Sequence, residues 1–415
     1  FASILIKTRE GRPIKVESNS DAPTLGCANA RVHASVLSLY DNMRLKGPLA
    51  FGKEVSWDNL CIQVKSRIKE MANANKNVVL LTPTIPSPTT KKIISRFTKL
   101  FPNIRHVVYD AVSSDSALNA FETFYGQRAL ADYDFSKSKI VVSIGANFLE
   151  DWQGGGYESG YAKARIPIKK NKKASMSKHF QFESNMSLTG SNADYRLPCT
   201  PSDQKNILAY IYDNLILGSP GQLSEKLKPL ADKALDELKN FGSDGVIVTG
   251  IEDENAQAAV FAINTFLNSK SFDPQSPKLI RQGNTEEALG LFKEIEEGNL
   301  DGLITIEVNP VFTYPNGESL SKAIKNLEFS LNFTTTSNET SSVSQFVAAV
   351  PHYLESWGDY EFKPGYFALA QPTIRPLFNT LQFQDVLNRL MGRDLKLYDE
   401  IKTHWQEEIL GTNSW

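Results

Sequence analysis

Polar residues that could bind a ligand follow several strand-like stretches of this sequence. Gly145 and Asn147 come directly after one short β-branched run. Glu183 ends a second such run, and Asn309 follows a third. In doubly wound α/β sheets, ligands bind beyond the carboxyl ends of the parallel strands. We therefore expect these residues to line one cleft, where glycine lets the backbone approach a ligand and carboxylate or amide groups hydrogen-bond it.

The cysteines and histidines are too scattered to predict a metal or redox site. Cys27, Cys61 and Cys199 form no C-x-x-C pair and no C-x-x-C-H motif for haem attachment. The five histidines show no zinc-binding spacing: His33, His106, His179, His352 and His404. We expect all of these side chains to be packed core or surface residues.

Length and composition indicate a globular protein of several domains. The chain has 415 residues, of which 41% are hydrophobic and 22% charged, and one ordinary core does not reach that size. The net charge of −2 gives no electrostatic reason to expect binding to nucleic acid or to an anionic membrane. No apolar run approaches the length needed to span a bilayer.

Short β-branched runs alternate with helix-like stretches along the whole chain. The runs lie at 78–82, 106–110, 139–144, 180–183, 245–250, 303–306 and 329–333. This alternation is typical of parallel sheets with crossover helices. It predicts an α/β fold with two doubly wound, Rossmann-like parallel-sheet domains.

Two other stretches are open to more than one interpretation. Residues 163–178 carry seven Lys or Arg and no acid, which suits either a patch for phosphates or acidic partners or, as we favour, a solvated loop. The run Gly154-Gly155-Gly156 neither follows a strand nor leads straight into a helix, as a phosphate loop would. We expect it to be a flexible connection.

Both ends of the sequence suggest part of a longer protein. Phe1 lies inside an expected strand, and Trp415 follows helix-like sequence without a stop signal. The first residues show no charged region ahead of an apolar core, so we expect no signal peptide within them.

Residues 11–49 carry a sequence pattern that resembles a known family. They begin with Gly-Arg-Pro. Their last part matches the family pattern at Leu39, Tyr40, Asp41, Arg44, Leu45, Lys46, Pro48 and Leu49. This pattern resembles the opening of the molybdopterin oxidoreductase family (the dimethyl-sulfoxide reductase superfamily), where a cluster-ligating cysteine lies between the two parts. The position of that cysteine falls on Asn29, and asparagine supplies no thiolate for an iron–sulfur cluster. The resemblance implies that the fold is retained and the electron-transfer chemistry is lost.

The resemblance continues along the chain and implies a cofactor cleft. Matching stretches are Ile144-Gly145-Ala146-Asn147, Glu183-Ser184-Asn185, Leu197-Pro198 with Pro201-Ser202-Asp203, Asn309-Pro310, and His352-Tyr353-Leu354-Glu355-Ser356-Trp357-Gly358-Asp359. In active relatives these turns hold the guanine-dinucleotide arms of the molybdenum cofactor. The resemblance therefore implies that Glu183 and Asp203 accept hydrogen bonds from guanine, and that the turns at Gly145, Asn147, Ser202 and Asn309 face phosphates. The phosphate turns are degraded, because Ser202 replaces a glycine and Asn185 an arginine.

The same family implies a metal ligand soon after residue 110. Ser113 is the closest match, and Asp115 is next. Serine and aspartate also favour helix N-termini, so without the family Ser114 or Asp115 capping a helix at 116–124 is the preferred interpretation. We expect no metal in this chain and keep Ser113 and Asp115 as ligands for the alternative in which a metal is bound.

The resemblance also divides the chain into domains. Residues 1–50 are expected to form a small N-terminal β-containing domain. Residues 51–110 with 216–345 form the first Rossmann-like domain, and 111–215 form the second. Residues 346–415 are expected to return and pack on the N-terminal domain.

Within the family, the stretches ARVHASVLSLYD, FESNMSLTGSNADYRLP and VPHYLESWGD resemble the iron–sulfur subunits of alternative complex III, a quinol:electron-acceptor oxidoreductase. The resemblance implies a structural scaffold without its own cofactor, whose iron–sulfur clusters lie in a ferredoxin-like C-terminal part absent from this sequence. It further implies partner subunits of a membrane respiratory complex and a periplasmic location, attached to the inner membrane through those subunits.

Two alternatives come from other functional classes. One is an active molybdenum or tungsten oxidoreductase that binds molybdopterin guanine dinucleotide. The other is a binding module for small, nucleotide-type ligands that reuses the cleft around Asn147, Glu183 and Asn309.

Overall fold

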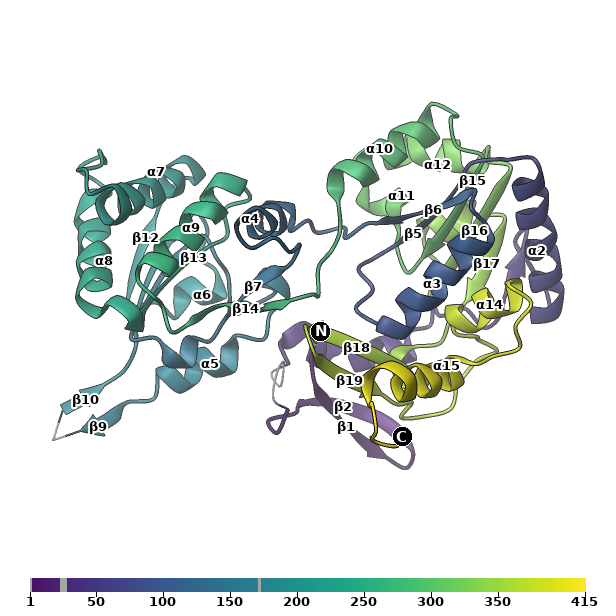
Figure 1. Ribbon diagram of the computed structural model, residues 1–415, viewed down its shortest axis with the longest axis horizontal. Coiled ribbons are helices and arrows are strands. Elements are labelled where there is room, and N and C mark those ends of the chain that lie inside the picture. The colour runs from purple at the N-terminus through teal and green to yellow at the C-terminus, as the bar shows by residue number, and fades with distance from the viewer. Residues whose placement is uncertain (1, 23–27, 171–172) are drawn as a thin grey trace. The chain divides into compact units, whose positions relative to one another are not determined.

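The computed structural model describes residues 2–22, 28–170 and 173–415, which divide into two compact units (Figure 1). Unit 1 contains Ser114–Arg281 and parts of the first 35 residues. Unit 2 contains Val36–Ser113, Gln282–Trp415 and Thr8–Ile14. Each unit is built around its own parallel sheet, as the alternating strand and helix pattern predicts. Among the described residues, no helix has both the length and the apolar character needed to cross a membrane.

Unit 1 has a four-stranded parallel sheet in the order β12-β11-β8-β13. Its strands are β8 (Ile140–Ile144), β11 (Lys178–Glu183), β12 (Tyr195–Pro198) and β13 (Gly245–Thr249). Its helices are α1 (Ala30–Ala34), α4 (Asp115–Tyr125), α5 (Glu158–Ala164), α6 (Leu188–Ser191), α7 (Pro201–Tyr212), α8 (Lys228–Phe241) and α9 (Glu254–Phe266). Two antiparallel pairs complete the unit: β7 (Leu130–Tyr133) with β14 (Phe272–Lys278), and β9 (Ile168–Lys170) with β10 (Lys173–Ser175).

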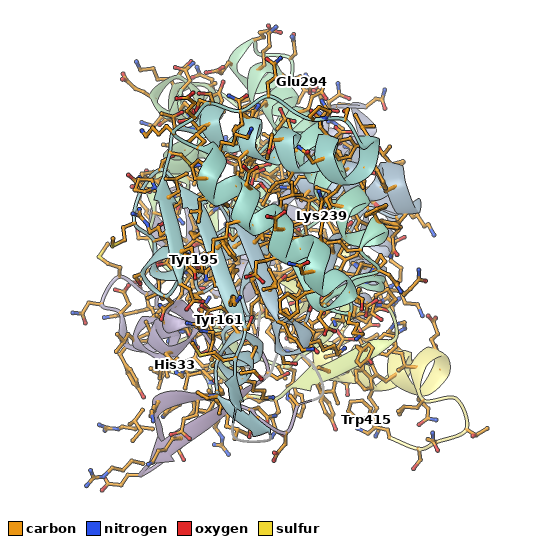
Figure 2. All side chains as sticks on the ribbon, turned by 90° about the vertical axis from the view of Figure 1, so that its left-hand side faces the viewer. His33, Tyr161, Tyr195, Lys239, Glu294 and Trp415 are labelled. Atoms are coloured by element: carbon orange, nitrogen blue, oxygen red, sulfur yellow. The ribbon has the colours of Figure 1, made fainter. Side chains whose placement is uncertain are left out.

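Both faces of the unit 1 sheet are buried, as expected for a doubly wound fold. Alternate side chains of β8 point to opposite faces: Val142 packs with α7 and α8, whereas Val141 packs with α4 and α5. Helix α8 turns charged side chains outward, and Lys239 in its last turn is exposed (Figure 2).

Unit 2 has a seven-stranded sheet in the order β4-β3-β17-β16-β15-β5-β6, parallel from β17 to β6 and antiparallel at β3 and β4. Its strands are β3 (Leu49–Ala50), β4 (Lys53–Glu54), β5 (Val78–Thr82), β6 (Ile104–Val108), β15 (Gly302–Ile306), β16 (Phe329–Thr334) and β17 (Phe346–Ala349). Helices α2 (Trp57–Asn73), α3 (Pro88–Leu100), α14 (Phe383–Leu390) and α15 (Leu397–His404) share one apolar cluster with the sheet. Helices α10 (Thr285–Glu296) and α12 (Gly317–Lys325) share the cluster on the other face (Figure 1).

The remaining elements are short. Helices α11 (Pro310–Thr313) and α13 (Glu339–Val343) follow β15 and β16. Strands β18 (Gly358–Lys363) and β19 (Tyr366–Ala370) form an antiparallel hairpin, and β1 (Ile4–Arg9) pairs with β2 (Arg12–Ser18) near the N-terminus.

The unit boundaries correct two of the expected domains. Strand β13 was expected in the first Rossmann-like domain with 216–345, but it pairs with β8 in register Val246↔Val141. Residues 216–281 therefore join the sheet of 111–215. Residues 1–50 do not form a separate unit, because their described residues divide between both units. Fifty residues bury too little apolar surface to make a core of their own.

Candidate functional site

Asn147, at the carboxyl end of β8, is held by the start of α6. Its Oδ1 accepts hydrogen bonds from the Thr189 amide (3.3 Å) and hydroxyl (2.8 Å). Its Nδ2 donates to Glu150 Oε2 at 2.6 Å. The Thr189 hydroxyl also accepts from the Leu149 amide at 2.9 Å. Both ends of the Asn147 amide group are thus used to fix the strand-end turn.

Asn309, at the carboxyl end of β15 in unit 2, has an equivalent set of partners. Its Oδ1 accepts from the Thr340 amide (3.1 Å) and hydroxyl (2.7 Å), and its Nδ2 donates to Glu339 at 2.7 Å. The Thr340 hydroxyl accepts from the Val311 amide at 3.2 Å. We call this arrangement the Asn–Thr clasp. Both units contain it, although its glutamate comes from the loop after β8 in unit 1 and from α13 in unit 2.

The clasps differ at the residue two positions before each asparagine. Gly145 has φ +72° in unit 1, and Glu307 has φ +52° in unit 2. Side chains rarely adopt this left-handed backbone, which costs little only for glycine. The exposed Glu307 carboxylate lies 3.3 and 3.4 Å from the Thr335 hydroxyl. In unit 2, glutamate therefore occupies the left-handed turn position that glycine occupies in unit 1.

Glu183, at the end of β11, is a buried carboxylate with several internal partners. It accepts from the Ser187 hydroxyl at 2.6 Å, from Gln181 Nε2 at 3.1 Å and from Arg196 Nε at 2.5 Å. Burial raises the pKa of Glu183, but the hydrogen bonds from Ser187 and Arg196 outweigh it and lower the pKa below its ordinary value. Gly190 packs directly against the carboxylate, since a Cβ there would lie 1.8 Å from Oε1.

Asp203 and Ser202 form the N-terminus of α7. Asp203 accepts from the Thr200 amide at 3.0 Å and donates its own amide to the Thr200 hydroxyl at 3.2 Å, which is a capping box. The hydrogen bond from the Thr200 amide lowers the pKa of Asp203. The Ser202 hydroxyl lies 3.1 Å from that of Thr200. Thr200 is the N-cap of α7, Asp203 completes its capping box, and the Ser202 side chain, among the described residues, hydrogen-bonds only with the Thr200 hydroxyl.

The two candidate metal ligands fall on either side of the unit boundary. Asp115 is the first residue of α4, and its carboxylate pairs with Arg128 at 2.9 Å. Ser113 is the last residue of the unit 2 segment. Ser114 occupies the N-cap position of α4 without a side-chain capping hydrogen bond, so it does not supply the cap that the sequence suggested.

Asn29, at the expected position of the cluster cysteine, caps α1. Its Oδ1 accepts from the Val32 amide at 3.0 Å, and its Nδ2 donates to Asp151 at 2.7 Å. Arg31 also pairs with Asp151 at 2.9 Å. These contacts tie the N-terminal segment to the loop after β8 within unit 1.

The run Gly154-Gly155-Gly156 is a closely packed turn instead of a flexible connection. All three glycines have positive φ, between +72° and +90°. A Cβ on Gly154 would lie 2.3 Å from Ile280, and one on Gly155 would lie 3.0 Å from Asn29. Glycine is needed here for a backbone conformation and for space, neither of which a bare sequence displays.

The described part of the chain contains no cluster of side chains suited to bind a metal ion. No group of three His, Cys, Asp or Glu is placed to hold a metal ion there. Cys61 and Cys199 are free thiols, and burial raises the pKa of both, that of Cys199 to about 11. Cys27 lies outside the described residues.

Two segments of unit 2 that match the family pattern, 39–49 and 352–359, are joined by buried side chains. Arg44, from the first segment, binds Glu355 of the HYLESWGD stretch through Nη2–Oε2 at 2.6 Å and Nη1–Oε1 at 3.3 Å. Asp359 of the same stretch accepts from the hydroxyls of Ser87 and Thr89, each at 2.5 Å. These residues join segments of unit 2 that are far apart in sequence. Sequence reasoning noted both segments but missed their pairing.

No protein-family model matches the chain. A curated relative, the menaquinone reductase molybdopterin-binding-like subunit of Nitratidesulfovibrio vulgaris, is 23% identical over a 442-residue alignment that covers 94% of this chain. The chain spans 63% of that relative's length.

Two solved structures share the fold. Acetylene hydratase from Pelobacter acetylenicus matches with a TM-score of 0.69 and 12% identity, over 95% of this chain and 68% of its own. A formyltransferase/hydrolase complex from Methylorubrum extorquens matches with a TM-score of 0.55 and 13% identity, over 86% of this chain and 100% of the matched chain.

The α/β fold with parallel sheets is therefore that of the molybdopterin oxidoreductases, as predicted. The curated relative is named a molybdopterin-binding-like subunit, which agrees with the resemblance to the molybdopterin oxidoreductase family that the sequence carries.

Proposed function

We propose that this chain is a structural subunit, without a redox cofactor of its own, of a quinone-linked membrane respiratory complex. The name of the curated relative supports the complex, since that protein is a molybdopterin-binding-like subunit of a menaquinone reductase. Our more specific proposal is a complex of the alternative complex III type, to which the iron–sulfur subunit resemblance points.

The main support for the scaffold role is that the Glu183 carboxylate is already hydrogen-bonded within the protein. As a ligand for guanine it would have to offer free carboxylate oxygens. Instead both oxygens accept hydrogen bonds from within unit 1, and Arg196 neutralises the charge. Removing these partners from a buried carboxylate would cost more free energy than one new hydrogen bond to a ligand would provide. One oxygen of Asp203, Oδ2, accepts from the Thr200 amide in the capping box.

The available donors do not fit a four-iron cluster. Such a cluster needs several convergent thiolates. Asn29 stands at the expected ligand position and is committed to Val32 and Asp151. Cys61 and Cys199, the described free cysteines, belong to different units.

The donors for a molybdenum centre fit poorly as well. The Asp115 carboxylate is neutralised by Arg128, and a metal would have to displace that arginine. In unit 2, Glu307 places a side chain at the strand-end turn where glycine would admit a phosphate. These features support a scaffold over an active molybdenum or tungsten enzyme.

The partners and the location form part of the same proposal. We place the chain in the periplasm, attached to the inner membrane through partner subunits. Its own ferredoxin-like C-terminal part and the neighbouring subunits would dock on it, and the iron–sulfur clusters of that part would do the electron transfer. Fractionation of the native host with antibody detection tests the location, because release with the cytoplasmic fraction would contradict it.

Variant complexes in the native host test the scaffold role. Ser113→Ala and Asp115→Asn should leave quinone-linked turnover within about twofold of the wild type, because neither touches a reacting group. Arg44→Met should instead lower the amount of assembled complex while leaving turnover per complex unchanged. A loss of turnover of about a hundredfold for Ser113→Ala in fully assembled complex would show a catalytic metal site instead.

A further inference from the structure

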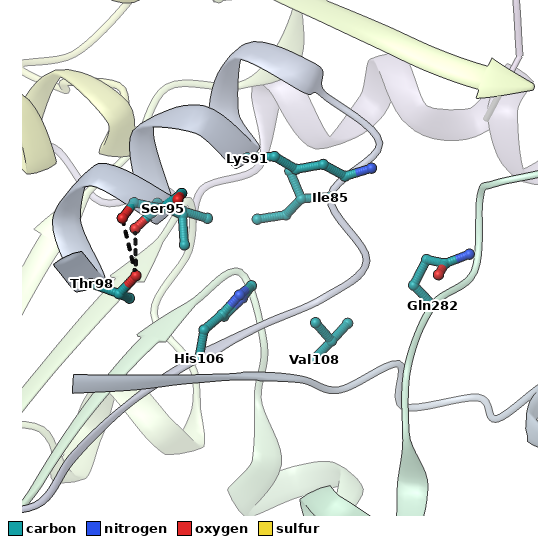
Figure 3. Close-up of a pocket in the computed structure, with 8 residues that line it drawn as sticks. Ile85, Lys91, Ser95, Thr98, His106, Val108 and Gln282 are labelled. Carbon is teal, nitrogen blue, oxygen red and sulfur yellow. Dashed lines mark hydrogen bonds between the residues drawn. The ribbon is translucent and has the colours of Figure 1, made fainter. Parts of the chain in front are cut away.

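A cavity of about 400 Å³ lies in unit 2 between α3 and β6 (Figure 3). Lys91, Ile94, Ser95 and Thr98 line it from α3, and His106 and Val108 line it from β6. Ile85, from the segment after β5, and Gln282 complete the lining. The volume lies at the lower end of the range of ligand pockets, which suits a small molecule.

The cavity exists because the sheet ends at β6. Strand alternation puts His106 and Val108 on the face that α3 covers, with β6 as the edge strand. The buried side of α3, with Ile93 and Phe97, packs over the sheet interior. Among the described residues, no further strand follows β6 in this sheet, and the cavity lies between this edge strand and α3.

His106, which lines the cavity, uses one ring nitrogen, Nε2, in a hydrogen bond with Thr82. The Thr82 hydroxyl donates to the Pro83 carbonyl at 2.9 Å, so it can only accept from His106 Nε2, at 2.8 Å. With the Thr82 proton on Pro83, we assign the proton of the neutral His106 ring to Nε2, which leaves Nδ1 as an acceptor. Burial lowers the pKa of His106, which keeps the ring neutral at pH 7. Among the described residues, nothing donates to its Nδ1.

Lys91 gives the cavity a positive charge that the protein does not neutralise. Its neighbours on α3, Lys92 and Arg96, pair with Glu408 and Glu400. In the described part of the chain Lys91 has no carboxylate partner, and no residue of the lining is acidic. The lining thus combines one cation, one neutral acceptor and an apolar wall.

We propose that this cavity binds a small hydroxylated carboxylate with a ring-sized apolar body. Its carboxylate pairs with Lys91, its apolar body packs on Ile94 and Val108, and its hydroxyl donates to His106 Nδ1. The ligand carboxylate thus complements the lysine charge, the apolar body complements the apolar side chains, and the hydroxyl complements the histidine acceptor. The lining contains none of the strand-end candidates Asn147, Glu183 and Asn309, and the site does not depend on the proposed scaffold function.

Calorimetric titration of the whole chain with 4-hydroxybenzoate tests this site. We expect saturable binding of one molecule per chain. Benzoate lacks the hydroxyl and 4-hydroxybenzyl alcohol lacks the charge, so each should bind about tenfold more weakly. No saturation by 4-hydroxybenzoate up to ~5 mM would contradict the proposal.

Three variants localise the binding. Lys91→Met should weaken 4-hydroxybenzoate about tenfold and leave 4-hydroxybenzyl alcohol unchanged. Ser95→Phe, at an exposed rim position, should block all three compounds. Lys99→Met is the matched control, because it removes an exposed lysine of the same helix outside the lining. Equal affinity in the wild type, Lys91→Met and Ser95→Phe would overturn the assignment.

Discussion

At the scale of single residues, the buried ion pair Arg44–Glu355 stabilises unit 2. The two side chains have 1% and 0% of their surface exposed. Arg44→Met leaves the Glu355 carboxylate buried and uncompensated, so we expect a loss of about 3–5 kcal/mol in the free energy of unfolding. Chemical denaturation followed by tryptophan fluorescence measures it. Arg67→Met, which breaks the exposed pair with Glu70, is the control and should change little. Equal effects of the two variants would contradict this account.

The same pair predicts a pH dependence of stability. Burial alone would raise the pKa of Glu355, but hydrogen bonds from Arg44 and the Leu377 amide outweigh it and hold the pKa below its ordinary 4.5. A lowered folded-state pKa means that the stabilisation is complete above 4.5 and is lost as the pH falls through the folded pKa. The double variant Arg44→Met/Glu355→Leu should therefore lose stability less steeply with acidification than the wild type. Parallel curves from denaturation at each pH would contradict this sign.

Glu307 predicts a stabilising substitution. Its φ of +52° costs an L-residue about 1–2 kcal/mol, whereas the greater freedom of glycine in the unfolded chain costs about 0.5–1 kcal/mol. Glu307→Gly should thus raise the unfolding free energy by about 0.5–1 kcal/mol. Glu307→Ala keeps the strain and removes the same carboxylate, so it is the control. If the alanine variant is as stable as the glycine variant, left-handed strain is not the cause.

At the scale of elements, the close approach of β8 and β13 fixes the strand-end turn of unit 1. A Cβ on Gly250 would lie 2.2 Å from the Gly145 carbonyl oxygen, which is backbone and cannot move aside. We expect Gly250→Ala to destabilise unit 1 by about 2–3 kcal/mol. Gly290→Ala in α10 is the control: nothing lies within 4 Å of its Cβ, so better helix propensity should stabilise by about 1 kcal/mol. Thermal unfolding compares the two, and a neutral Gly250→Ala would contradict the observed packing.

Local pattern predicted most elements, because apolar runs and caps act over a few residues. Strand β8 and helix α4 lie within a residue or two of their expected positions. The sequence did not predict which sheet β13 joins. All five residues of β13 are buried, as are those of β15, so the pattern of a strand does not identify the strand beside it. Sequence placed Asn147 and Asn309 correctly at strand ends. The Asn–Thr clasp needs contacts across 42 and 31 residues, which spacing alone does not reveal.

At the scale of the whole molecule, the nucleotide-binding alternative makes a distinct prediction. A ligand that binds only the native state raises apparent stability. Since Asn147, Glu183 and Asn309 have internal partners, guanosine di- and triphosphate should not raise the melting temperature of the chain. A concentration-dependent rise that Glu183→Gln abolishes would favour the binding-module alternative.

The central claim is that this molybdopterin-oxidoreductase-like chain acts without a cofactor of its own. Elemental analysis for molybdenum, tungsten and iron, together with extraction of fluorescent pterin, tests it on this chain purified from its native host. We predict neither pterin nor stoichiometric metal. Near-stoichiometric molybdenum or tungsten with pterin would contradict the claim and make Ser113 and Asp115 the first residues to mutate.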